Sequence, residues 1–426
     1  MAGMTDRQTP GAAASALPAG VTAARRAWWD PRAWPWWAQS LAVYAAARLF
    51  SASWLLAAAA AQGPNPWAGD HPTYAQITGL FWDAGWYRRI VDEGYPPELP
   101  VGEDGLVQQN AWAFFPLFPL LVRGLMAATS LPFEVAAPTL SLVLAGAAMP
   151  VVFRLVERGA PRAVAARPGL PLASVALVAV FPTAAVLQTA YTESLALLLV
   201  AAALLLVVTR RYAAAGAVIL ALGFTRAVAL PMLAVVVVHA FARWRARRQH
   251  DAVTRADAVR LGVLAAVAGL SGVVWPAICG WVTGDPQAYL RTQEAWRGVR
   301  EVTPFGGWGY VSRFWFGDAA PWVLLLAAAL VVAVHVVPAA WRLGPELHVW
   351  PAAYLVYLAA AIEPGSSLGR FLLLAFPLAA VTAGIVTRPD WARRAWFFGV
   401  VAVMLGLHAV WIWQIWRLRP GSGWPP

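Results

Sequence analysis

Long apolar runs constrain this chain more than any other feature. They recur from residue 37 to residue 417 and are long enough to span roughly 30 Å of hydrocarbon. Residues 194–208, SLALLLVAAALLLVV, are apolar on every side, as a helix surrounded by lipid must be. With 60% hydrophobic and only 12% charged residues, the sequence predicts an all-α polytopic membrane protein.

We predict about eleven transmembrane helices within a membrane domain covering residues 34–417, with a large first extracytoplasmic loop. Segment 112–129 is apolar but contains two prolines and Arg123, so we expect it to lie along the membrane surface. Residues 1–33 are predicted to be a disordered cytoplasmic tail without a signal peptide, and residues 418–426 a short C-terminal tail. The predicted spans are 37–61, 134–153, 169–189, 191–209, 212–225, 227–243, 260–283, 320–341, 347–363, 370–387 and 395–416.

The arginines predict which side each loop faces. All 32 basic residues are arginine, and most fall in cytoplasmic segments if the N-terminus is cytoplasmic and the spans alternate. Loops 62–133 and 284–319 then lie outside and hold most of the acidic residues. The net charge of +11 is therefore a topology signal rather than a sign of nucleic-acid binding. The arginine- and alanine-rich composition favours a GC-rich bacterial genome, hence a bacterial plasma membrane.

Cysteine and histidine chemistry is sparse. Cys279 is the single cysteine, so no intramolecular disulfide can form, and no Cys/His pattern has metal-binding spacing. Four acidic residues of the first loop could bind a divalent ion but lack a recognisable ligand pattern. We therefore expect no metal and no cofactor. The four acidic residues are Asp92, Glu93, Glu103 and Asp104.

The first loop carries a polar block, FWDAGWYRRIVDEGY, at residues 81–95. A carboxylate such as Asp83, facing water at the membrane surface, can act as a general base. The aromatic residues Trp82, Trp86 and Tyr87 flank it, and they suit either stacking on a sugar or anchoring at the membrane interface.

Two arginines of the same block, Arg88 and Arg89, have two interpretations. The guanidinium group is well shaped for a phosphate. Alternatively, each arginine pairs with the acidic residue four positions later if the stretch is helical.

Further polar residues interrupt apolar runs on the predicted outer side. Tyr191 and Glu193, in QTAYTESL, mark either a site or a helix start. Arg226 and Arg370 lie in tight apolar turns, GFTRAVALP and EPGSSLGRFLLLAFP, and could meet a phosphate or a carboxylate. Arg48, inside the first span, is expected to pair with a carboxylate or to extend to the membrane edge.

The second long loop holds an amide and an indole three residues apart. Gln293 and Trp296 share one face if their segment is helical, and together could hold a hydroxylated ligand.

Six of these stretches occur in the order seen in one known family. FWDAGWYRRIVDEGYP, AFFPLFPLLVR, FPTAAVLQTAYTESLALLL, GFTRAVALP, GDPQAYLRTQEAW and SLGRFLLLAFPLA resemble PIG-V-like mannosyltransferases. That family contains the second GPI mannosyltransferase and its bacterial relatives, within the GT-C class. The resemblance covers roughly residues 40–390. The first motif and the YTES motif are its specific ones.

The resemblance implies a GT-C helical bundle that transfers mannose from polyprenyl-phosphate-mannose, the co-substrate, by an inverting single displacement. It also implies that Asp83 is the catalytic base. The charge on the departing phosphate needs electrostatic stabilisation, and our own candidates for this role are Arg226 and Arg370, with Arg88 or Arg89 as alternatives. Because bacteria of the expected GC-rich source make no GPI anchors, a cell-envelope glycolipid or glycan is the expected acceptor. The expected partners are thus membrane lipids, the lipid-linked donor and this acceptor.

Our interpretation of the residues themselves gives roles to the rest of the predicted site. Glu193 would orient a sugar or hold an arginine, and the aromatic and amide side chains would contact sugar or acceptor: Trp82, Trp86, Tyr87, Tyr191, Gln293 and Trp296. Two alternatives stay open: a GT-C relative with another sugar or a protein acceptor, and a lipid or glycolipid transporter. The polar residues gather on one face and no internal repeat is visible, which disfavours a transporter.

Overall fold

The computed structural model describes residues 33–247, 253–299, 301–419, 421 and 426. The tail predicted at residues 1–33 lies outside these residues except for Ala33. Within the described part of the chain every regular element is helical, apart from an isolated bridge between Val101 and Val107. The all-α prediction is therefore confirmed.

Among the described residues, four helices are long and apolar enough to cross a membrane. They are α1 (Trp36–Ala60), α5 (Phe133–Gly159), the run Gly307–Val336 that includes α14 (Gly307–Phe316) and α15 (Ala320–Val336), and Asp390–Trp416, which includes α20 (Asp390–Trp411).

A fifth span exists if one bent pair crosses as a unit. Helices α11 (Arg255–Ser271) and α12 (Val274–Thr283) meet at a 48° bend. The eleven spans stay a prediction, because several segments form shorter helices: α8 (Glu193–Val208), α9 (Tyr212–Gly223), α10 (Pro231–Ala246) and α17 (Pro345–Ala361).

Predicted span 169–189 is wrong as a continuous helix. Span 169–189 is helical only over α7 (Leu170–Ala179), and the chain continues as the 3₁₀ turn η3 (Ala184–Gln188). Pro182 follows the end of α7 and, lacking an N–H, cannot continue it.

Span 370–387 is divided in the same way. It consists of α18 (Leu368–Phe371), η5 (Leu372–Ala375) and α19 (Leu378–Gly384), with Pro377 at the last break. This break leaves Arg370 in a short helical turn rather than inside a long helix.

The structure also corrects the prediction for Arg48. Among the described residues, this arginine pairs with no carboxylate. Its guanidinium donates to the carbonyl oxygen of Ala179 at 2.6 Å and to that of Ala184. The last carbonyls of a helix lack intrahelical partners and carry partial negative charge, so a buried arginine is a suitable donor to them.

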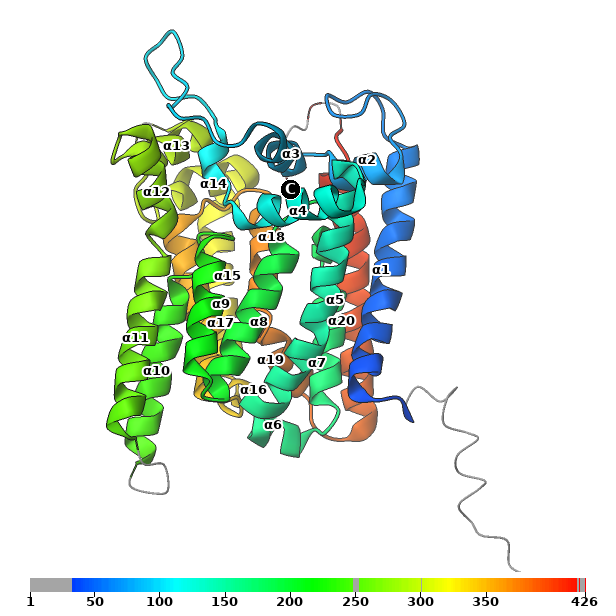
Figure 1. Cartoon of the computed structure of the whole chain (residues 1–426). Coiled ribbons are helices and arrows are strands. Elements are labelled where there is room, and N and C mark those ends of the chain that lie inside the picture. Colours follow the sequence, from blue (N-terminus) through cyan, green and yellow to red (C-terminus); the bar gives the residue numbers. More distant parts are fainter. Residues whose placement is uncertain (1–32, 248–252, 300, 420, 422–425) are drawn as a thin grey trace, which may run out of the picture.

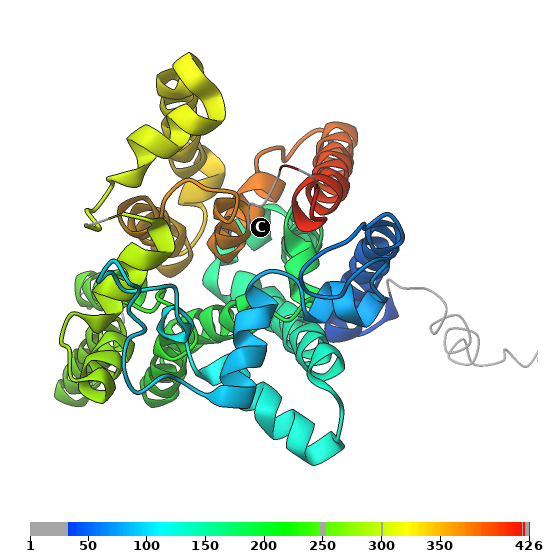
Figure 2. The same ribbon diagram turned by 90° about the horizontal axis from the view of Figure 1, so that it is seen from above.

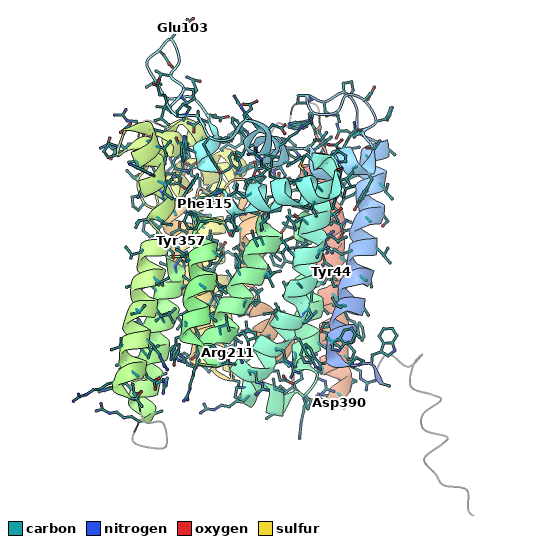
Figure 3. All side chains as sticks on the ribbon, viewed as in Figure 1. Tyr44, Glu103, Phe115, Arg211, Tyr357 and Asp390 are labelled. Carbon is teal, nitrogen blue, oxygen red and sulfur yellow. The ribbon has the colours of Figure 1, made fainter. Side chains whose placement is uncertain are left out.

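The helices stand side by side as a bundle, with α5 packed along α8, α7 and α1, and α10 along α17 (Figures 1 and 2). One end of the bundle, which we call the loop end, holds the long segments 62–132, 284–299 and 301–306. These segments contain α2 (Tyr74–Gly79), α3 (Asp83–Glu93), α4 (Leu117–Thr129) and α13 (Ala288–Arg297). Arg211 and Asp390 lie at the opposite end (Figure 3).

Helix α4 lies across the loop end of the bundle (Figure 1). Phe118 and Val122 are buried against the bundle, whereas Leu120 and Leu121 are exposed. This 13-residue helix forms the C-terminal part of the predicted surface segment 112–129, and its two faces suit a position along a membrane surface.

Gly79, at the end of α2, lies closer to α5 than any other residue type could. A Cβ at this position would stand 2.5 Å from the Cα of Glu134 and 2.6 Å from its carbonyl oxygen. This close approach directs the chain from α2 into α3, where Asp83 begins the helix.

We expect Gly79→Ala to lower the free energy of unfolding by about 1–3 kcal/mol, because the added methyl group overpacks a backbone contact. The midpoint of thermal unfolding in detergent measures this loss. The control is Gly124→Ala at an exposed position of α4, where a Cβ meets nothing within 4 Å. Equal unfolding midpoints for the two variants would show that the α2–α5 approach is not tight.

Candidate functional site

Helix α3 presents Asp83 in its first turn, where a carboxylate interacts favourably with the helix dipole. The backbone reverses immediately before it, because Trp82 has φ 59° and ψ −125°. A bulky residue rarely adopts a positive φ, and such strain persists only where the surrounding structure enforces it.

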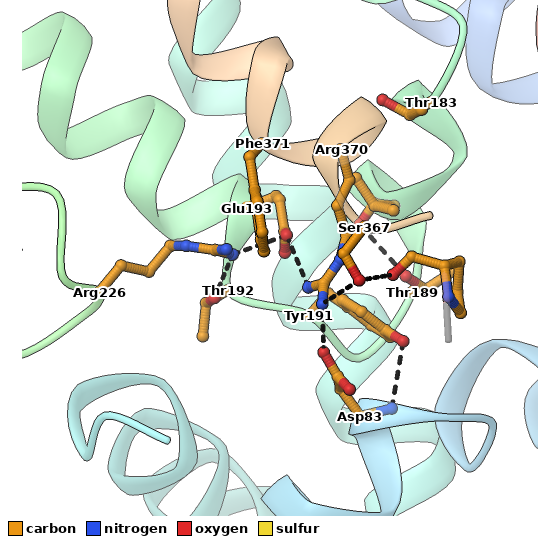
Figure 4. A network of polar contacts seen from close by, with 12 residues as sticks. Asp83, Thr183, Thr189, Tyr191, Thr192, Glu193, Arg226, Ser367, Arg370 and Phe371 are labelled. Atoms are coloured by element: carbon orange, nitrogen blue, oxygen red, sulfur yellow. Dashed lines mark hydrogen bonds and ion pairs between the residues drawn. The ribbon is translucent and has the colours of Figure 1, made fainter. Parts of the chain in front are cut away.

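Asp83 belongs to a chain of ion pairs formed by four segments distant in sequence (Figure 4). Its Oδ2 lies 2.6 Å from Nη2 of Arg370, in α18. Nη1 of Arg370 lies 3.0 Å from Oε1 of Glu193, the first residue of α8. The same Oε1 lies 2.6 Å from Nη1 of Arg226, in the turn before α10.

The charges in this network balance, with two carboxylates and two guanidinium groups. The Glu193 side chain is fully buried, and those of Asp83 and Arg226 are 13% exposed. Ion pairs this close and this buried need their partners, because removing one partner leaves an uncompensated charge. The network is open toward solvent only at its two ends, Asp83 and Arg226.

Hydroxyl groups extend the network. Thr192 Oγ1 accepts a hydrogen bond from Arg226 Nη1 at 3.0 Å and lies 3.4 Å from the Tyr87 hydroxyl. Burial raises the pKa of Tyr87 well above its ordinary value, so its hydroxyl stays neutral. Ser367 Oγ accepts from Arg370 Nη2 at 3.5 Å.

Aromatic rings surround the two arginines. The Arg370 guanidinium lies 5.0 Å from the centre of the Tyr191 ring and 4.7 Å from that of Phe371. Arg226 lies 4.7 Å from the same Phe371 ring. Such contacts stabilise a cation without neutralising it, and they add to the ion pairs that hold the two arginines.

The structure thus brings together Asp83, Tyr87, Tyr191, Glu193, Arg226 and Arg370 among the predicted site residues. The Tyr191 hydroxyl accepts the backbone N–H of Asp83 at 3.1 Å, and its ring lies beneath Arg370.

Arg88 and Arg89 lie outside the network. Arg88 is 3.6 Å from Asp92 and Arg89 is 2.9 Å from Glu93, each pair four residues apart on α3 with more than half of each side chain exposed. Of the two interpretations of these arginines, phosphate binding or pairing along the helix, the structure shows the pairing along the helix.

The remaining aromatic candidates pack among themselves. The Trp86 ring lies 5.1 Å from that of Trp296 and stacks on Phe114 at 5.8 Å. Trp296 also donates to the backbone oxygen of Asn110, and Gln293 lies half-buried one turn before it on α13. The Trp82 indole N–H is directed toward the backbone oxygen of Trp416, near the C-terminus of the chain, rather than toward Asp83.

Thr192 interrupts the apolar sequence beside Tyr191 and Glu193 but was given no role of its own, and Ser367 and Phe371 were not predicted. Each is a direct chain neighbour of a selected charge, or lies within three residues of one, and that proximity was the available signal. No group of three or more His, Cys, Asp or Glu side chains that could hold a metal occurs among the described residues.

Comparisons with known proteins give little. No family model and no curated protein matches the chain. The chain is similar to the crystal structure of the Archaeoglobus fulgidus oligosaccharyltransferase in complex with Zn and sulfate, with 13% identity and a TM-score of 0.43. The match covers 86% of this chain and 53% of that one, so this chain spans about half the length of that protein. A likeness this distant carries no argument about activity.

Proposed function

We propose that this chain is a membrane glycosyltransferase of the GT-C class, related to the PIG-V-like mannosyltransferases. It moves mannose from polyprenyl-phosphate-mannose to a cell-envelope glycolipid or glycan. One observation carries the proposal: the Asp83 carboxylate is held 2.6 Å from the Arg370 guanidinium at the loop end of an apolar helical bundle.

The proposed reaction needs a base and a cation in the same place. The base removes the proton of the acceptor hydroxyl, and the cation stabilises the negative charge on the departing lipid phosphate. Asp83 and Arg370 supply this pair. Arg226 adds a second cation, linked to Arg370 because both arginines pair with Glu193.

The step is a single displacement with inversion. Asp83 takes the acceptor proton as the hydroxyl oxygen bonds to the anomeric carbon of mannose. The bond between that carbon and the phosphate oxygen breaks, and its electron pair leaves with polyprenyl phosphate. The donor phosphate competes with Asp83 for Arg370 Nη2, so donor binding releases the carboxylate to act as a base.

The proposed membrane arrangement follows from the distribution of arginines among the loops. The N-terminus is cytoplasmic, eleven segments cross the bacterial plasma membrane, and the loop end faces outward. Two observations support it: the long loops and Asp83 share one end of the bundle, and Arg211 lies at the other. The choice of mannose rests on the motif resemblance.

The test is a transfer assay with three labelled donors: polyprenyl-phosphate-mannose, polyprenyl-phosphate-glucose and GDP-mannose. Purified protein in detergent is mixed with each donor and a total lipid extract of the source organism, beside a mock preparation lacking the protein. We expect a labelled lipid from polyprenyl-phosphate-mannose alone.

The other outcomes separate the alternatives. Product from the glucose donor would keep the class and reject mannose, whereas product from GDP-mannose would reject the lipid-linked donor. A transporter would form no covalent product in detergent, but would move the intact labelled donor across a liposome membrane.

A further inference from the structure

The backbone before Asp83 is held by the far end of the chain. Trp82, the strained residue, donates its indole N–H to the backbone oxygen of Trp416 at 2.7 Å. Trp416 ends the π-helical turn η6 (Ile412–Trp416) that follows α20. π-helical turns are rare in proteins, and those that occur are often found at functional sites.

Trp416 reaches both sides of the Asp83 backbone. Its own indole N–H donates to the backbone oxygen of Ile77 in α2 at 3.1 Å. Its ring lies 5.4 Å from the ring of Tyr191. The Tyr191 hydroxyl in turn accepts the Asp83 N–H (Figure 4). The Trp416 side chain is fully buried, so these contacts are not exchanged with water.

A second link secures the same end of α20. The Gln62 side chain donates to the backbone oxygen of Leu418 at 3.1 Å and accepts its N–H at 3.0 Å. The chain just beyond α20 is therefore tied to the end of α1 and forms a fixed support for Trp416.

We propose that Trp416 and Trp82 are positioning residues that hold the Asp83 carboxylate in its working orientation. This inference rests on the proposed function, because it assigns Asp83 the role of base. It also gives Trp82 a role in fixing the backbone rather than in stacking on a sugar.

The physical reason is that general-base catalysis depends on geometry. A misplacement of about 1 Å can cost about 10²-fold in rate. The positive φ at Trp82 sets the direction of the Asp83 side chain, and without its anchor that backbone relaxes toward an ordinary conformation.

The test compares Trp416→Phe and Trp82→Phe with Trp411→Phe. Each variant removes an indole N–H and keeps an aromatic ring. Trp411 is the matched control because it is buried, lies 5.8 Å from the Trp416 ring, and its Nε1 has no hydrogen-bond partner in the described structure. We expect kcat to fall about 10- to 100-fold in the first two variants. We expect donor KM to change less than threefold in both, and Trp411→Phe to leave both constants unchanged.

Hydrogen exchange gives a readout independent of activity. Backbone exchange in the segment 77–95 should rise in Trp416→Phe and Trp82→Phe but not in Trp411→Phe, with unfolding midpoints close to that of wild type. Wild-type protein without transfer activity would refute the proposed function and leave this measurement interpretable. Unchanged exchange and kcat in both variants, or an equal loss in Trp411→Phe, would overturn the inference.

Discussion

Asp83→Asn leaves the protein folded and lowers the rate of sugar transfer by about 10²–10⁴-fold, the range that a general base contributes. The amide oxygen of asparagine can still accept the hydrogen bond from Arg370, which also keeps its ion pair with Glu193. The lost function is specific: an amide cannot take the proton of the acceptor hydroxyl. Initial rates with the lipid-linked donor measure the effect, and the thermal unfolding midpoint checks the fold.

The control is Asp92→Asn on the same helix. Asp92 is about half exposed and pairs with Arg88 at 3.6 Å, and such surface pairs contribute about 0–1 kcal/mol. We expect this variant to transfer sugar at the wild-type rate. Near-normal turnover by Asp83→Asn would refute the base assignment, while equal losses in both variants would point to damage to α3.

The sequence was sufficient to predict the helical class and to identify the residues that carry the site's charge. Apolar runs and isolated charges are local features, so Asp83, Glu193, Arg226 and Arg370 could be selected without knowing which of them meet. Their pairing depends on how α3, α8 and α18 pack, and sequence spacing contains no measure of that packing.

Other features of the site were beyond the reach of sequence patterns. The breaks after α7 and within 370–387 depend on prolines whose effect in a membrane protein varies with neighbouring helices. Arg48 was expected to pair with a carboxylate or to extend to the membrane edge, but the break after α7 exposes backbone carbonyl groups to which it donates instead. Trp416 is one of 25 tryptophans in the sequence, and only its contacts with Trp82 and Ile77 distinguish it.

Glu193→Gln should have the largest effect on stability, with a loss of about 3–5 kcal/mol in the free energy of unfolding. Glu193 is the shared partner of Arg226 and Arg370 and its side chain is fully buried. Without the charge of Glu193, Arg370 keeps only Asp83 as a carboxylate partner, and Arg226 keeps no carboxylate partner among the described residues. We expect a lower thermal unfolding midpoint in detergent and less monodisperse protein on size-exclusion chromatography.

A charge-balanced double variant tests the cause. Glu193→Gln with Arg226→Gln removes one charge of each sign and leaves Arg370 paired with Asp83, so it should recover more than half of the lost stability. The surface control Glu93→Gln, which breaks an exposed pair with Arg89, should cost less than about 1 kcal/mol. If the double variant were no more stable than the single one, unpaired charge would not explain the loss. The recovered protein would still lack a second cation for the donor phosphate, so we expect its stability to return without its full transfer rate. That separation would assign Glu193 to holding the arginines and Arg226 to the donor.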